Sequence, residues 1–379
     1  MTSYYLDNAA TTRMLDEVRT GAMALLEGEG LNPSSLHRLG ISARETMGEA
    51  RRRLAGLLGV PPQAVVFTSG GTESDNLALR GVFGGRPKGD RLLISALEHP
   101  AVSETARALE RAGVRVEVIP VTPEGVLDLG ALDRMLDHQV AMVSCMSVSN
   151  EMGTLQPLVE AGRLIRQKAP GAVFHVDAVQ GFTKGEIPWR SAGVGLLSLS
   201  GHKVHGPKGV GALIRCRDIL LEPQMTGGGQ ESGLRSGTEN PFGAAAFALA
   251  AQAVQALHKS MAEERMAYHR RWLEFLQEFP RLKVYRSVHQ TPYLVRFSMP
   301  PVPAEVILLH LEQQGLFVST TSACSTRKAE ASPVLLAAGL EEREALSSIR
   351  LSFSVFNRLD ELEGAFAAFR LAMAKLGKL

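Results

Sequence analysis

The stretch SLSGHKVHGPKGVGAL occupies residues 198–213, and Lys203 stands near its centre. An apolar, strand-like run from Val194 to Leu199 precedes the lysine, and small residues lie on both sides of it. Glycine and serine let the chain turn and let the backbone approach a ligand closely. A lysine held in such a place can form a Schiff base with an aldehyde. A lone loop lysine, in contrast, is most often only an exposed charge.

A second stretch, HVDAVQGFTKG at residues 175–185, places Asp177 at the end of another predicted strand. Pyridoxal phosphate (PLP) needs both features, because a lysine binds its aldehyde and a carboxylate keeps its ring nitrogen protonated. A carboxylate at a strand end can also cap a helix. The two stretches together indicate a PLP site, although each alone has an ordinary structural explanation.

Short apolar runs alternate with helical patterns through the first two thirds of the chain. The predicted strands are residues 65–67, 92–95, 114–119, 140–146, 173–177, 194–199 and 210–214, and the predicted helices include 73–82, 100–112, 129–136 and 158–168. This alternation predicts an α/β fold with a mostly parallel sheet covered on both faces. Ligands in such sheets bind outside the carboxyl ends of the strands.

The last third of the chain has a different pattern. A long alanine-rich helical region runs from Pro241 to about Phe279, and the remainder mixes strands (293–297, 349–353) with helices (304–314, 360–376). This pattern predicts a second, smaller α+β domain.

Composition excludes several classes of protein. The chain has 379 residues, of which 45% are apolar and 21% charged, and its net charge of +2 predicts neither nucleic-acid nor membrane binding. The N-terminus MTSYYLDNAATT shows no secretory signal, and no apolar stretch is long enough to span a bilayer. Three widely spaced cysteines suggest neither a disulfide framework nor an intrinsic metal cluster, so a reducing cytoplasm is the expected location.

The stretch VVFTSGGTESDNLAL at residues 65–79 predicts a strand, a small-residue turn and a helix start. Gly71 and Thr72 would offer backbone amides and a hydroxyl at the positive end of the helix, which suits a phosphate. Thr72 followed by Asp75 also fits plain helix capping. No GK[ST] follows, so the turn is not a Walker A loop.

Cys324 differs from the other two cysteines. Cys145 and Cys216 lie in or beside apolar strands and fit the pattern of small buried residues. Cys324 lies in the polar stretch STTSACSTRKAEAS at residues 319–332, close to Arg327 and Lys328. An exposed thiol beside cations tends to have a lowered pKa and to be nucleophilic.

Three further residues are ambiguous when taken singly. His99 lies between a strand and a helix that opens with Pro100, where a histidine is more often structural. Asn150 precedes a glycine-containing turn and fits turn chemistry. Arg350, in the apolar stretch SSIRLSFS at residues 347–354, needs a partner, which is either a structural carboxylate or the α-carboxylate of a substrate.

Taken in order, these motifs resemble the cysteine desulfurases of the NifS/IscS type, which are class V, fold-type I PLP enzymes. The resemblance runs from YLDNAATT at residues 5–12 to SSIRLSFS at 347–354. It implies a PLP-dependent transferase fold with a seven-stranded sheet in the large domain. It assigns residues 13–258 to that PLP-binding domain, and residues 1–12 with 259–379 to the small domain that carries the cysteine loop.

The resemblance also assigns roles to individual residues. The implied cofactor contacts are Gly71 and Thr72 (phosphate), His99 (ring stacking and proton transfer), Asn150, Asp177 (ring nitrogen), Gln180 (ring oxygen), Ser200, His202 and Lys203. Ser149 stands where the family commonly has a further asparagine. Asn150 and Arg350 would hold the substrate carboxylate.

The glycine-rich stretch TGGGQESGLRSGTEN at residues 226–240 predicts a permissive loop. Taken alone it is a flexible surface connection. In the family this loop crosses a homodimer interface, and Thr238 would reach the phosphate of the other subunit. Ser232 stands where the family usually has an arginine, so one positive charge of the family pattern is missing.

The implied reaction converts L-cysteine to L-alanine and leaves a persulfide on Cys324. Lys203 removes the Cα proton, and the sulfur passes to an iron–sulfur scaffold protein or a tRNA thiolation protein. Cys324 could also transiently ligate a cluster shared with such a scaffold. The usual sequence after the cysteine is replaced by residues 329–333, AEASP, although the spacing fits the group in which the cysteine lies on a mobile segment.

Two alternatives remain open at this level. A class V aminotransferase or a selenocysteine lyase would share the PLP residues, and an aminotransferase would not need Cys324. A non-catalytic sulfur-trafficking scaffold would keep the fold without turnover.

Overall fold

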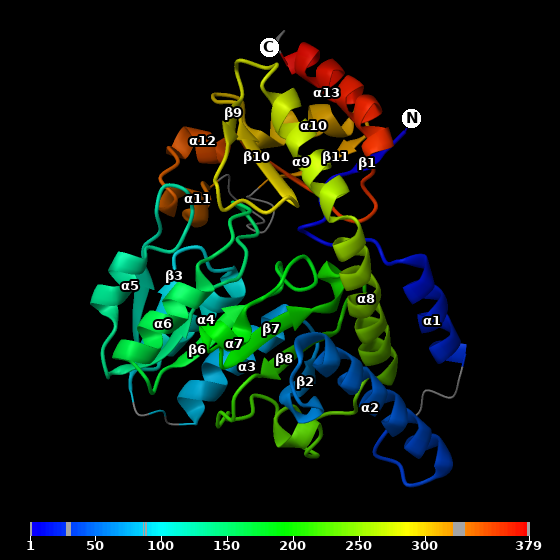
Figure 1. Ribbon diagram of the computed structural model, residues 1–379, viewed down its shortest axis with the longest axis vertical. Coiled ribbons are helices and arrows are strands. Elements are labelled where there is room, and N and C mark those ends of the chain that lie inside the picture. Colours follow the sequence, from blue (N-terminus) through cyan, green and yellow to red (C-terminus); the bar gives the residue numbers. More distant parts are fainter. Residues whose placement is uncertain (1, 28–31, 86, 88, 321–329, 377–379) are drawn as a thin grey trace.

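The computed structural model describes residues 2–27, 32–85, 87, 89–320 and 330–376. The chain forms a large part built on a seven-stranded sheet and a smaller part built on a four-stranded sheet, with both chain ends at the smaller part (Figure 1). The predicted α/β class with a mostly parallel seven-stranded sheet is confirmed.

The strand order in the large sheet is β2-β8-β7-β6-β5-β3-β4. The strands are β2 (Val65–Thr68), β3 (Arg91–Ser95), β4 (Arg115–Ile119), β5 (Val140–Ser144), β6 (Val173–Asp177), β7 (Leu196–Ser200) and β8 (Gly211–Arg215). All neighbours from β7 to β4 are parallel, whereas β8 pairs antiparallel with β2 and β7. The connection from Ser200 to Gly211 is too short for a crossover helix, so β8 returns beside β7 in the opposite direction.

Helices cover both faces of this sheet, because its strands are apolar on both sides. One face packs against α2 (Arg38–Leu58), α5 (Leu129–Met135), α6 (Leu158–Lys168) and α8 (Pro241–Ser260). The other face packs against α3 (Gly71–Gly84) and α4 (Pro100–Arg111). The helix α1 (Asp16–Glu27) lies beside α8 at the rim of the large part (Figure 1).

The smaller part has the sheet order β12-β13-β10-β9 and a two-stranded pair, β1-β11. Its strands are β1 (Tyr4–Tyr5), β9 (Lys283–Tyr285), β10 (Leu294–Ser298), β11 (Leu316–Phe317), β12 (Ser319–Thr320) and β13 (Ser348–Ser352). Its helices are α9 (Ala262–Leu276), α10 (Ala304–Glu312), α11 (Pro333–Ala337), α12 (Glu342–Leu346) and α13 (Leu362–Leu376). The helical region expected from Pro241 to Phe279 is two helices, because α8 ends before Met261 and α9 begins after it.

The domain boundaries 13–258 and 1–12 with 259–379 remain our proposal. The aromatic core around Trp272 supports them, because it joins Tyr4 and Leu6 from the N-terminus to side chains of α9, β10 and α13.

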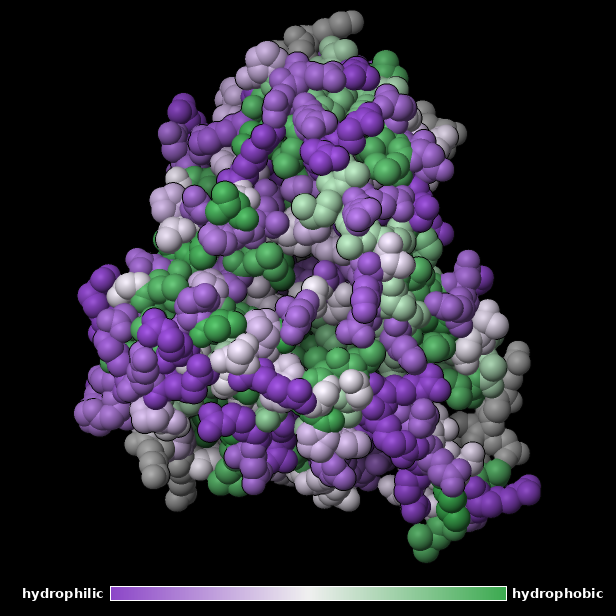
Figure 2. All heavy atoms as spheres, in the orientation of Figure 1, coloured by the Kyte–Doolittle hydropathy of each residue, from purple (hydrophilic) through white to green (hydrophobic). Residues whose placement is uncertain are grey.

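The surface is mostly hydrophilic on the face shown in Figure 2, and its hydrophobic side chains lie in separate patches. Within the described part of the chain, no helix is both long and apolar enough to cross a bilayer.

Candidate active site

A cavity of about 340 Å³ lies where the parallel strands end. Residues that follow β3, β5, β6 and β7 line it, as expected for ligand sites in parallel sheets. Ten of the residues singled out from the sequence line this one cavity: Gly71, Thr72, His99, Asn150, Asp177, Gln180, Ser200, His202, Lys203 and Arg350.

Lys203 ends a short 3-10 turn, Gly201–Lys203, directly after β7. Its Nζ donates hydrogen bonds to the carbonyl oxygens of Ala9 (2.6 Å) and Ala10 (2.7 Å). Thr12 Oγ1 donates to the carbonyl oxygen of His202 at 2.9 Å. The N-terminal segment is therefore part of the cavity wall and directs the Lys203 amine toward the site.

Gln180 is held by two hydrogen bonds. Its Nε2 donates to the Ala9 carbonyl at 2.8 Å, and its Oε1 accepts from Lys184 Nζ at 3.1 Å. Burial, together with the charges of Lys203 and Arg350, lowers the pKa of Lys184 to about 7. Sequence reasoning missed Lys184, although it stands four residues after Gln180 in the same stretch.

Asp177 lies at the end of β6 on the face covered by α3, and its Oδ1 accepts from the backbone N–H of Val179 at 2.9 Å. Burial raises the pKa of Asp177 to about 6, while that N–H and Lys203 act in the opposite direction. Burial and the charge of Asp177 also raise the pKa of Asp75, which is only 1% exposed. The sequence pattern suggests a helix cap that includes Asp75, but in the structure Asp75 is a second buried acid near Asp177.

His175 lies on the same face as Asp177, two residues earlier in β6. Its ring nitrogens contact Ser144 Oγ (2.9 Å) and Ser198 Oγ (3.0 Å), and burial lowers its pKa to about 3. The histidine beneath the carboxylates is therefore neutral and adds no charge to them.

His99 caps α4, because its Nδ1 accepts from the backbone N–H of Ala101 at 3.1 Å. Burial and the nearby charge of Lys203 lower the pKa of His99 to about 4. The ring is therefore neutral at pH 7, with its proton on Nε2. The structural and functional interpretations are compatible, since the capping histidine also lines the cavity.

The first turn of α3 begins at Gly71, and Gly70 is its N-cap. Thr72 therefore lies inside the helix and does not cap it, so that interpretation was wrong. A Cβ atom added to Gly71 would lie 2.7 Å from Val179 Cγ2, so only glycine fits here without displacement. The backbone N–H groups at this helix end and the Thr72 hydroxyl are a suitable donor set for a phosphate.

Arg350 lies in β13 and reaches the large part. Its Nη1 donates to the Asn150 carbonyl at 2.9 Å, and its Nη2 pairs with Asp7 Oδ1 at 3.0 Å. Of the two alternatives from the sequence, the structure gives Arg350 the carboxylate partner Asp7. The side chain also lines the cavity, and its role toward a substrate carboxylate stays a prediction.

Thr238 is exposed and does not line the cavity of its own chain. Its loop is fixed by Glu231, whose carboxylate accepts from Arg51 Nη2 at 2.6 Å and from the backbone N–H of Phe67 at 2.8 Å. Ser232 next to it has φ +57°, a left-handed conformation.

Cys324 lies outside the described residues. Cys145 is buried, Cys216 is partly buried, and burial raises the pKa of Cys216 to about 12 and that of Cys145 well above its usual range. Both are poor nucleophiles at neutral pH.

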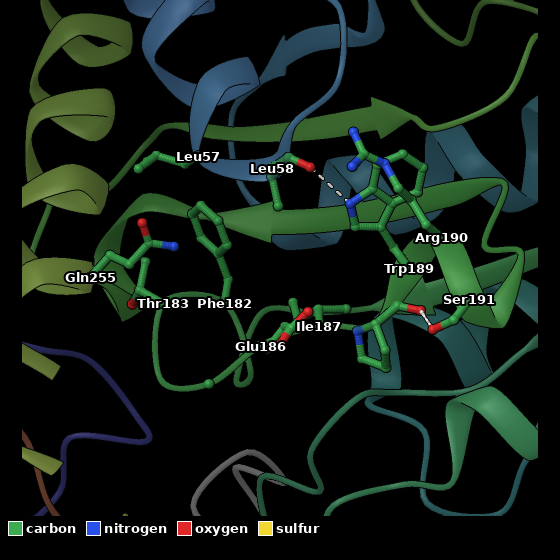
Figure 3. Close-up of a pocket in the computed structure, with 12 residues that line it drawn as sticks. Leu57, Leu58, Phe182, Thr183, Glu186, Ile187, Trp189, Arg190, Ser191 and Gln255 are labelled. Atoms are coloured by element: carbon green, nitrogen blue, oxygen red, sulfur yellow. Dashed lines mark hydrogen bonds between the residues drawn. The ribbon is translucent and has the colours of Figure 1, made fainter. Parts of the chain in front are cut away.

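A second hollow, of about 300 Å³, is separate from this cavity (Figure 3). It lies between the end of α2 and the loop around Trp189, whose Nε1 donates to the Leu58 carbonyl at 2.8 Å. None of the predicted site residues lines it.

Comparison with known proteins gives the class of the protein. Residues 4–364 match the family model described as aminotransferase class-V. The chain is 37% identical over 371 residues to a "NifS/IcsS protein homolog" of Lactobacillus delbrueckii subsp. bulgaricus, covering 96% of both chains. It is 36% identical over 382 residues to "Cysteine desulfurase IscS" of Dictyoglomus turgidum, covering 98% of this chain and 95% of the relative.

A solved structure described as a "NIFS-LIKE PROTEIN" superimposes with a TM-score of 0.92 at 31% identity, over 100% of both chains. The chain therefore belongs to the class-V aminotransferase family and, within it, to the cysteine desulfurases of the NifS/IscS type.

Proposed function

We propose that the chain binds PLP in the cavity beside Lys203 and removes sulfur from L-cysteine. The observation that carries the proposal is the convergence of Lys203, Asp177, His99 and Arg350 on one cavity, together with family membership. The residues fit the cofactor. The first turn of α3, where only glycine fits at position 71, suits the phosphate. The buried carboxylate of Asp177 suits the ring nitrogen, and the amine of Lys203 suits the aldehyde.

When bound, PLP would supply an electron sink for the Cα of an amino acid, and Lys203 would hold its aldehyde. In the proposed arrangement, Gly71 and Thr72 would hold the phosphate, Asp177 would partner the ring nitrogen and Gln180 the ring oxygen. His99 would contact the ring, while Ser200 and His202 complete the wall of the cavity. The raised pKa of Asp177 fits a carboxylate that gains a positive partner when the cofactor enters.

Arg350 and Asn150 hold the α-carboxylate of the substrate, and Lys203 accepts the Cα proton. Neutral His99 carries its proton on Nε2, where it can donate a hydrogen bond to a reacting group. The Cys324 thiolate attacks the substrate sulfur, so an S–S bond forms, the substrate C–S bond breaks, and alanine leaves. Family membership supports the role of Cys324.

The finer assignments of partners follow the same proposal. The enzyme is a homodimer in which Thr238 of each subunit reaches the phosphate site of the other. The persulfide passes to an iron–sulfur scaffold protein or another acceptor protein, and the location is cytoplasmic. The exposed position of Thr238, away from its own cavity, supports the two-subunit site.

The test is alanine formation from L-cysteine by the PLP-loaded protein, with and without a reductant that removes persulfide. Cys324→Ala should abolish alanine formation, whereas Cys216→Ala, a matched loss of a partly buried thiol, should leave it unchanged. Alanine that survives in Cys324→Ala would indicate a lyase. Amino-group transfer to a keto acid without alanine release would indicate an aminotransferase.

A further inference from the structure

A second buried arginine lies beside Arg350. Residues 296 and 350 are directly opposite each other in the antiparallel pair β10–β13. In these strands Val295, Phe297 and Ile349 face the apolar core of the small part, so both arginines lie on the other face. Arg296 is 0% exposed and Arg350 is 6% exposed.

Both guanidinium groups bind the same two-residue segment of the large part. Arg296 Nε donates to the Glu151 carbonyl oxygen at 2.7 Å, and Arg350 Nη1 donates to the Asn150 carbonyl oxygen at 2.9 Å. Ser332 Oγ adds a third contact, to Glu151 Oε2 at 2.6 Å. The segment 150–151, which lines the cavity, is thus fixed by small-part side chains.

The position of Arg296 is further defined by Ser348, whose Oγ accepts from Arg296 Nη1 at 2.6 Å. Since Ser348 and Arg350 are two residues apart on one face of β13, this bond ties Arg296 to the strand that carries Arg350. Substituting Arg296 would therefore loosen the segment 150–151 relative to Arg350.

The positive charges of Arg296 and Arg350 favour binding of an anion beside them. Arg350 pairs with Asp7, whereas no carboxylate among the described residues forms an ion pair with Arg296. Arg296 Nη2 and Arg350 Nε are both buried without a hydrogen-bond partner. Burial lowers the pKa of Arg296 to about 10, an effect that Glu151 opposes and Arg350 reinforces, so Arg296 is still charged at pH 7.

We propose that Arg296 is a positioning residue for the substrate carboxylate. It fixes the Asn150–Glu151 segment against Arg350 and adds a second positive charge behind it. This inference rests on the proposed function, in which Arg350 and Asn150 bind an α-carboxylate. If Arg296 had a purely structural role, its substitution would weaken the binding of ligands with and without a carboxylate equally, or would impair folding.

The experiment compares PLP-loaded wild type with Arg296→Gln, Arg296→Lys and the control Arg271→Gln. Arg271 is a half-exposed arginine of the small part, paired with Glu363 at 2.6 Å. L-Cysteine turnover gives KM and kcat. Binding of L-alanine and of ethylamine, which lacks the carboxylate, is followed by the absorbance of the bound cofactor.

We expect Arg296→Gln to raise KM for L-cysteine on the order of tenfold with kcat little changed, because binding common to ground and transition states is lost. L-Alanine affinity should fall by a similar factor, whereas ethylamine affinity should not change. Arg296→Lys should raise KM roughly threefold, since an ammonium keeps the charge but not the planar fork. Arg271→Gln should behave as wild type.

Equal losses for L-alanine and ethylamine, or KM values for both Arg296 variants within twofold of wild type, would overturn the inference. If Arg296→Gln does not fold, the KM of Arg296→Lys is the test, and a value within twofold of wild type overturns the inference. Wild type that neither turns over L-cysteine nor binds L-alanine would refute the proposed function itself, which is a different outcome.

Discussion

Among single residues, Ala9 joins two side chains that line the cavity, those of Lys203 and Gln180. Its carbonyl oxygen accepts from Lys203 Nζ and from Gln180 Nε2. Lys184 Nζ donates to Gln180 Oε1, so the amide group of Gln180 has one defined orientation, with Nε2 toward the Ala9 carbonyl. Lys184 therefore supports Gln180 without lining the cavity itself.

Asp177 should reduce the stability of the cofactor-free protein. Its folded pKa of about 6 is above its ordinary value, so the folded state holds the proton more tightly than the unfolded chain. Stability from this group is therefore lost as pH rises from about 4 to about 6. We expect Asp177→Asn to be more stable than wild type by up to about 3 kcal/mol above pH 6, and to lose that advantage near pH 4.

Thermal unfolding of the cofactor-free proteins at pH 8 and pH 4.5 measures this difference. The same variant should retain PLP poorly, because the ring nitrogen loses its partner. An Asp177→Asn midpoint at or below that of wild type at pH 8 would contradict the assignment of Asp177 as a strained, buried carboxylate.

Several site residues could be predicted from the sequence, because each lies at the end of an apolar strand or among small residues next to it in the chain. Lys203, Asp177 and His99 each follow an apolar strand, and the carboxyl ends of parallel strands meet at one edge. Asp75 and Arg296 could not be identified in the same way, since their burial depends on distant elements. The signal for Arg296 was a charged residue within the apolar run YLVRFS, the same signal that singled out Arg350.

At the scale of secondary-structure elements, the contact between α6 and α7 (Trp189–Ala192) depends on Gly162. A Cβ atom added there would lie 1.7 Å from the Ala192 carbonyl oxygen. We expect Gly162→Ala to destabilise the protein by about 3 kcal/mol or more, because the two helices must separate.

Gly56 is the matched control, since it lies in α2 and an added Cβ atom would meet nothing within 4 Å. Gly56→Ala should raise stability by about 0.5–1 kcal/mol, because alanine loses less backbone entropy in a helix. Thermal unfolding of both variants tests the pair. Similar midpoints for the two would show that the close α6–α7 contact is not required.

Glu231 connects the loop 226–240 to α2 and β2. Its carboxylate pairs with Arg51 and accepts the Phe67 N–H, and its side chain is only 3% exposed. Glu231→Ala should destabilise the protein by about 3 kcal/mol, because it leaves a partly buried guanidinium unpaired. Glu231→Gln keeps a hydrogen-bond acceptor and should lose less stability than Glu231→Ala. Equal losses of stability in the two variants would mean that the ion pair with Arg51 contributes little.

Sequence patterns predicted the long elements better than the short ones. The seven large-sheet strands are rich in apolar residues, and their predicted ranges overlap the observed strands. The strands β1, β11 and β12 have two residues each, too few to show a period-two pattern. The break between α8 and α9 at Met261 has no glycine or proline to indicate it.

At the scale of the whole molecule, buried histidines should control acid stability. Burial lowers the pKa of six of them: His99, His175, His202, His205, His258 and His269. Between pH 6.5 and about 4 the unfolded chain binds their protons and the folded protein does not, so stability falls as pH falls. Four buried acids with raised pKa values act in the opposite direction: Asp75, Glu98, Glu151 and Asp177.

Since the histidines outnumber these acids, we expect a net loss of stability on going from pH 7 to pH 5. Urea unfolding of the cofactor-free protein at both values measures it. A midpoint that rises at pH 5 would show that the buried acids dominate.

In the proposed reaction, Cys324 of this chain carries the sulfur from L-cysteine. The most direct measurement is peptide mass spectrometry after one equivalent of L-cysteine reacts with PLP-loaded protein without reductant. We expect one extra sulfur atom on the peptide that contains Cys324, one alanine per subunit, and no added sulfur on Cys145 or Cys216. Alanine formed together with free sulfide, and no sulfur on Cys324, would contradict it.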